Sequence, residues 1–124
     1  MKELFYKHDD ESFIRKRKDK EELINWTNHL EFIINELNLF LKIEKRLLNK
    51  TEVNKTINDL RNQNAIVLKN LYRYDISLNN SIECDTVDCD TFYLSTHEKN
   101  RQEYLNFVEK VHLFKMNFYR MILD

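Results

Sequence analysis

The chain has 124 residues, of which 33% are charged and 42% hydrophobic, and it contains neither glycine nor proline. Phosphate-binding loops, dinucleotide-binding turns and the sharp turns that present catalytic nucleophiles all need glycine, which excludes the P-loop, Rossmann and α/β-hydrolase classes. The formal net charge of −1 creates no overall field that would draw the chain to nucleic acid or to an anionic membrane.

The lack of glycine also favours helices, because tight β-hairpin turns depend on glycine or Asn-Gly. We therefore expect an all-α fold, an antiparallel bundle of three long helices over residues 20–49, 52–79 and 96–123. Residues 1–19 are predicted to form a charged arm or a short fourth helix, which precedes the bundle of residues 20–124.

The arm of residues 1–19 is rich in charges of both signs. Its basic cluster is Arg15, Lys16, Arg17 and Lys18, followed closely by Lys20. Its acidic residues include Asp9, Asp10, Glu11 and Asp19. Because these two sets adjoin each other, a solvated surface is favoured over a phosphate-binding one, and nucleic acid is not an expected partner.

The first predicted helix, residues 20–49, is apolar over most of its circumference. Its main seam alternates spacings of three and four residues, at Leu23, Thr27, Leu30, Ile34, Leu37, Leu41 and Leu48. A second stripe lies beside this seam, at Trp26, Ile33, Phe40 and Leu47. A helix this apolar is either the centre of the bundle or part of an oligomer interface, and we interpret the second stripe as an interface.

The second predicted helix, residues 52–79, follows a short connection in which Thr51 can cap it, so it should run antiparallel to the first. Its apolar seam contains one polar residue, Asn64. Counting along the three helices places Glu36, Asn64 and His112 near one level of the bundle. We interpret these three residues as a buried polar layer that fixes the register of the helices.

A metal site at the same level is the alternative to this structural layer. Glu109 and His112 have the i, i+3 spacing that lets two side chains of one helix reach one ion, as in carboxylate-bridged metal bundles. Such bundles use two of these motifs, and the sequence offers one. We therefore expect no cofactor, and keep a metal-binding bundle that uses Glu36, Glu109 and His112 as the alternative function.

The acidic connection at residues 80–94 contains the two cysteines of the chain, Cys84 and Cys89. Two cysteines are too few for a disulfide scaffold, and a thiolate zinc site needs a second pair of ligands. We expect both cysteines to be reduced, with a local disulfide as the alternative. Ser95 and Glu98 then match the capping-box pattern, which predicts that the third helix starts there.

The order of several residues resembles that of small bacterial helical proteins of unknown activity. The residues that carry the resemblance are Trp26, Leu30, Phe32, Glu36, Leu37, Asn62, Gln63 and His97. The likeness extends over residues 22–122. It implies a helical bundle and supplies no activity.

The remaining expectations concern function and location. We find no nucleophile in a recognisable triad, and we expect a non-catalytic protein rather than an enzyme. The charged start leads into no apolar signal core, and no stretch is apolar enough to span a membrane, so we expect a cytoplasmic protein. The wide apolar surface of the first helix predicts that the chain binds another protein or a second copy of itself.

Overall fold

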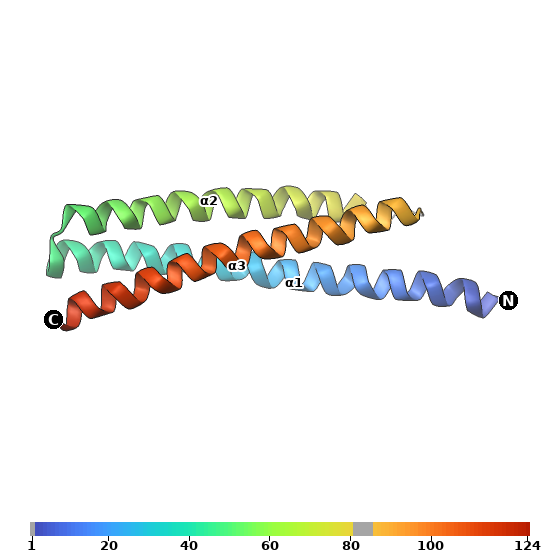
Figure 1. Ribbon diagram of the computed structural model, residues 1–124, viewed down its shortest axis with the longest axis horizontal. Coiled ribbons are helices and arrows are strands. Elements are labelled where there is room, and N and C mark those ends of the chain that lie inside the picture. Colours follow the sequence, from blue (N-terminus) through green and yellow to red (C-terminus); the bar gives the residue numbers. More distant parts are fainter. Residues whose placement is uncertain (1, 81–85) are drawn as a thin grey trace.

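The computed structural model describes the backbone of residues 2–80 and 86–124, and the side chains of residue 11 and of residues 13–80 and 86–124. The helices are α1 (Lys2–Ile43), α2 (Thr51–Asn80) and α3 (Val87–Leu123), with a π-helical turn η1 (Glu44–Leu48) that continues α1. The described ranges contain no β-strand. Figure 1 shows that α1 and α3 run in the same direction, that α2 runs opposite to both, and that α3 lies obliquely across α1. The prediction of an all-α, antiparallel three-helix bundle is confirmed.

Helix α1 differs from the prediction at its start. It begins at Lys2 and passes without a break through the basic cluster, so residues 1–19 contribute no separate arm or fourth helix within the described backbone. The physical reason is that this segment contains no glycine or proline, while its lysine, arginine and glutamate residues are good helix formers. The N-terminal turns of α1 extend past the ends of α2 and α3 (Figure 1).

The reversal between α1 and α2 takes place without glycine. Asn49 adopts the left-handed conformation, with φ 52° and ψ 45°, and its N–H donates a hydrogen bond of 2.6 Å to the carbonyl oxygen of Glu44. Asparagine tolerates this conformation better than other residues with a Cβ atom, which suits it to the end of a helix. The side chain of Glu44 is buried at the same turn and accepts a hydrogen bond from the Asn54 amide at 3.2 Å.

Helix α3 begins nine residues before the predicted start at residue 96, so the capping-box assignment of Ser95 and Glu98 is wrong. The cap is instead Thr86, whose hydroxyl accepts a hydrogen bond from the Cys89 N–H at 3.2 Å. Acidic residues in the first turn stabilise the positive end of a helix dipole, and α3 places Asp88 there. Much of the predicted acidic loop is therefore helix, and its residues 81–85 lie outside the described part of the chain.

The expected reduced state of Cys89 is not found. Cys89 is disulfide-bonded. The sequence contains one other cysteine, Cys84, which lies outside the described residues. Because disulfides persist mainly in oxidising compartments, the cysteines lend no support to the cytoplasmic location, which stays a prediction.

Three of the four residues assigned to an interface belong to the core of the single chain. Trp26, Ile33 and Phe40 expose only 6%, 2% and 3% of their surface, whereas Leu47 exposes 68%. Helix α3 contacts two of them: Trp26 stacks on His97, and Phe40 meets the ring of Phe118 edge-on with a centroid distance of 4.6 Å. The wide apolar surface of α1 is therefore covered within the single chain, by α2 and by side chains of α3.

The described helices share one core. The buried apolar residues are Leu23, Trp26, Leu30, Ile33, Leu37, Phe40, Val53, Ile57, Leu60, Leu71, Tyr74, Leu78, Phe107, Val111 and Phe118. None of the helices in the described ranges contains an apolar stretch of the length that crossing a bilayer requires.

Candidate functional site

The structure does not bring the predicted polar layer together. Asn64 is buried as expected, and its amide donates a hydrogen bond of 3.0 Å from α2 to the carbonyl oxygen of Leu30 on α1. Glu36 is half-buried and forms a 2.9 Å ion pair with Lys115, while His112 is exposed. The register of α3 explains this, because residue 112 is turned away from the side of the helix that carries the buried positions Phe107, Val111 and Phe118.

The alternative metal site is lost for the same reason. Glu109 is exposed together with His112, on the side of α3 that faces away from α1 and α2. Glu36 is held by Lys115 on the inner side of that helix. The three residues proposed as ligands therefore do not converge.

A different cluster of titratable side chains does converge, between α1 and the N-terminal third of α3. Asp19 and Glu22 stand one turn apart on α1, and His97 approaches them from α3. The Nε2 atom of His97 lies 2.6 Å from Glu22 Oε1 and 3.4 Å from Asp19 Oδ1. One ligand atom from each of the three residues lies within 4.8 Å of the others, and no second group of this kind occurs among the described residues.

Two further residues hold this cluster in place. The Nδ1 atom of His97 lies 2.6 Å from the hydroxyl of Tyr74 on α2, so both ring nitrogens have partners. Arg101, one turn after His97, donates from Nη2 to Glu22 Oε1 at 2.6 Å and from Nε to Glu22 Oε2 at 3.2 Å. The network thus joins all three helices. His97 exposes 3% of its surface, so the network reaches the interior of the bundle.

Trp26 covers one face of the cluster. Its ring stacks on His97 with a centroid distance of 5.0 Å and an interplanar angle of 26°. Its ring also stacks with Tyr104, at 5.4 Å and 21°, and the guanidinium carbon of Arg101 lies 5.9 Å from the Trp26 centroid. These contacts restrict rotation of the imidazole and hold Nε2 toward the two carboxylates.

The two carboxylates experience opposite electrostatic environments. Burial raises the pKa of Asp19, opposed by the attraction of His97 and reinforced by the repulsion of Glu22. Burial also acts to raise the pKa of Glu22, but the hydrogen bonds from Arg101 and His97 outweigh it and lower that pKa. Burial, with the negative charges of Asp19 and Glu22, raises the pKa of Tyr74, which keeps its hydroxyl protonated. Glu22 is therefore a stabilised anion, whereas the charge on Asp19 is disfavoured.

Sequence reasoning missed this cluster although it noted two of its members. Asp19 was assigned to a solvated arm, and His97 to the start of the third helix. The available signal was the i, i+3 spacing of Asp19 and Glu22, which places two carboxylates on one face once α1 is continuous through that point.

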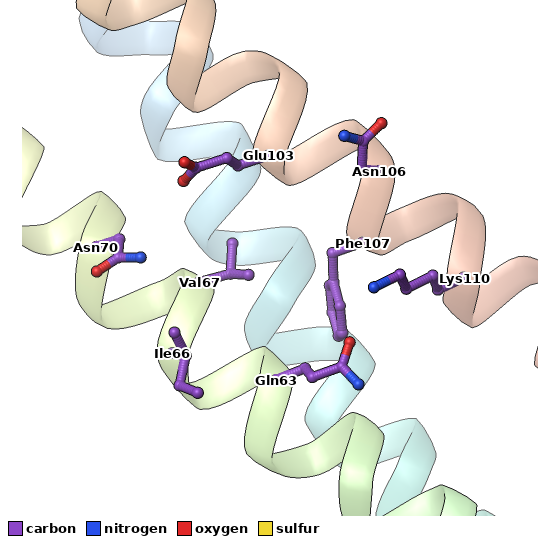
Figure 2. Close-up of a pocket in the computed structure, with 8 residues that line it drawn as sticks. All are labelled: Gln63, Ile66, Val67, Asn70, Glu103, Asn106, Phe107 and Lys110. Atoms are coloured by element: carbon purple, nitrogen blue, oxygen red, sulfur yellow. The ribbon is translucent and has the colours of Figure 1, made fainter.

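A shallow groove lies elsewhere, between α2 and α3. Figure 2 shows its lining residues, which are Gln63, Ile66, Val67, Asn70, Glu103, Asn106, Phe107 and Lys110. Its acid and its base, Glu103 and Lys110, stand two turns apart on α3. No imidazole or thiol joins them, so the groove offers no set of groups suited to acid–base or nucleophilic catalysis.

Comparison with known proteins finds no matching family model, no matching curated protein and no matching solved structure. The resemblance to small bacterial helical proteins therefore stays a prediction.

Proposed function

We propose that this chain is a non-catalytic helical-bundle protein that acts by self-association through the outward side of α3. The observation that carries the proposal is a set of exposed apolar side chains on that side of α3.

The apolar residues for such an interface lie on the outer face of α3, which we define as Leu105, Leu113, Met116 and Leu123. All four side chains are exposed. They lie on the side of α3 opposite to its buried residues, so no part of the described chain covers them. Exposed apolar side chains gathered on one face of a helix are typical of surfaces that bind other proteins.

The charges on this face favour a second copy of the chain as the partner. Glu109 and Arg120 lie among the apolar residues of the outer face, and both are exposed. If two copies pack α3 antiparallel about an axis between Leu113 and Met116, Glu109 of each chain faces Arg120 of the other. A two-fold axis pairs a surface with itself, so this complementarity satisfies the requirement of a symmetric dimer.

The test is the mass of the protein in solution. Size exclusion with light scattering from about 1 to 100 µM should give twice 15.3 kDa, in the concentration range where micromolar dimers form. Leu113→Lys should give a monomer with unchanged helical circular dichroism. Leu39→Lys on α1 is the matched control, because Leu39 and Leu113 both expose 57% of their surface, and it should stay dimeric. A wild-type protein that is monomeric at every concentration would contradict the proposal.

A further inference from the structure

We propose that Asp19, Glu22 and His97 form a binding site for a divalent cation, best suited to Zn²⁺, that links α1 to α3. This site is separate from the self-association proposed above, because the outer face of α3 contributes no ligand to it. An imidazole nitrogen with two carboxylate oxygens is a ligand set that Zn²⁺ and its neighbours accept, and it leaves a fourth position for water.

Two of the three ligand distances fit a tetrahedral ion after one small movement, and the third, between the carboxylate oxygens of Asp19 and Glu22, is within 4.8 Å. Bonds of about 2.0–2.1 Å place the ligands of tetrahedral Zn²⁺ about 3.3 Å apart. His97 Nε2 and Asp19 Oδ1 already lie 3.4 Å apart. Glu22 Oε1, at 2.6 Å from Nε2, is at hydrogen-bond distance and must withdraw by about 0.7 Å, a shift within reach of a flexible glutamate side chain. The ion would then replace the hydrogen bond between His97 and Glu22.

The surroundings of His97 match those of a histidine that binds metal. A metal on Nε2 requires that the ring proton reside on Nδ1, and metal-binding histidines usually donate that proton to a neighbouring oxygen. The Tyr74 hydroxyl oxygen lies 2.6 Å from Nδ1, in position to accept it. Stacking on Trp26 fixes the ring plane. If Nε2 carries a proton before the metal binds, binding releases that proton to solvent.

Asp19 is the residue that a purely structural network leaves unexplained. Tyr74, His97, Glu22 and Arg101 satisfy one another without it. Within the described part of the chain, Asp19 forms an ion pair with His97 at 3.4 Å, which is longer than the 2.6 Å pair between His97 and Glu22. A half-buried carboxylate beside a second carboxylate costs stability, which the charges of Arg15 and Arg101 offset in part and a bound cation would offset further.

The local charge also favours a cation. Arg101 pairs with Glu22 and Glu98, and its charge also acts on Asp19. The nearby cations Arg15 and Lys16 contact Asp90 at 3.5 Å and 3.8 Å, and Arg15 also attracts Asp19. The carboxylates of Asp19, Glu22, Asp90 and Glu98 outnumber these three cationic side chains, so a bound cation enters a site with an excess of negative charge.

The test is calorimetric titration of ZnCl₂ into chelator-treated full-length protein, with Co²⁺ absorption to report the coordination number. We expect one Zn²⁺ per chain, a tetrahedral Co²⁺ spectrum and a higher melting temperature with Zn²⁺. Asp19→Asn should weaken Zn²⁺ binding at least about tenfold, beyond the lower limit known for residues that only support a ligand. His97→Gln should abolish binding. Circular dichroism of each variant verifies that it is folded.

Two variants separate a metal site from a structural network. Arg101→Gln frees Glu22 and removes a neighbouring positive charge, so it should tighten Zn²⁺ binding while lowering the stability of the metal-free protein. Glu103→Gln is the matched control at an exposed position of α3 outside the network and should leave binding unchanged. We expect a micromolar Kd, which corresponds to a binding free energy of about −8 kcal/mol. The proposal is overturned if no stoichiometric binding occurs when ZnCl₂ is at about 100 times that Kd. It is also overturned if Asp19→Asn binds Zn²⁺ as tightly as the wild type.

Discussion

Replacing Tyr74 by phenylalanine tests the network at the contact between α2 and α3. The change removes one hydroxyl oxygen and leaves the aromatic ring in the core. That hydroxyl lies 2.6 Å from Nδ1 of His97, and both residues are buried. Once the hydroxyl is gone, the described neighbours offer Nδ1 no other hydrogen-bond partner, and its burial keeps water away.

The magnitude follows from this burial. Leaving a buried donor or acceptor unpaired costs about 1–3 kcal/mol, and we expect Tyr74→Phe to lower the free energy of unfolding by that amount. The chain offers a matched control in Tyr104→Phe. Tyr104 also contacts a histidine through its hydroxyl, but His29 and Tyr104 are both only half-buried, so water can replace the lost bond. That variant should lose at most about 0.5–1.5 kcal/mol.

The assay is urea unfolding followed by circular dichroism at neutral pH in the presence of a chelator. In a thermal melt of a chain of this length, each kcal/mol lost from the free energy of unfolding should lower the melting temperature by about 3–5 °C. If Tyr74→Phe loses no more stability than Tyr104→Phe, then the buried contact with His97 does not hold α2 to α3, and the reasoning is wrong.

Three further predictions concern other parts of the fold. Phe118→Ala should lower the free energy of unfolding by about 3–5 kcal/mol, because it opens a cavity beneath α3, whereas Leu123→Ala at an exposed position should change it by less than about 0.5 kcal/mol in monomeric protein. Thr86→Ala should cost about 1 kcal/mol and speed hydrogen exchange at the Cys89 amide, which loses its cap. Burial raises the pKa of Tyr104, so the folded state keeps the phenolic proton at a pH above 10, where the unfolded chain loses it. The contribution of Tyr104 to the free energy of unfolding is therefore full below pH 10 and falls as the pH rises further. Between pH 9 and pH 11, urea unfolding should show a smaller loss of stability for Tyr104→Phe than for the wild type.

The helical fold could be predicted because its signals are local. The absence of glycine and the seam of α1 and α2 indicate long amphipathic helices, and the short connection at Asn49 requires that they run antiparallel. The start of α3 was mispredicted because Ser95 and Glu98 form a good cap only if the chain before them is not helical. Thr86 provides an equivalent cap earlier, and nothing between the two interrupts the helix.

The site could not be predicted because it depends on the rotation of one helix against another. Periodicity gave the width of the apolar surface of α1, but not which neighbour covers Trp26 and Phe40. Likewise, Glu22 and His97 are separated by 75 residues in sequence. Their contact requires both the axial level and the rotation of α3. The predicted level was close, because Glu36 pairs with Lys115, three residues beyond His112, but the side of α3 that faces α1 could not be counted.

Trp26 gives this molecule a built-in optical reporter, because it is the only tryptophan in the chain. Its indole emission comes from one place, between the rings of His97 and Tyr104, where α1 meets α3. Separation of the helices admits water to the indole and changes its emission. Unlabelled protein therefore signals the docking of its last helix.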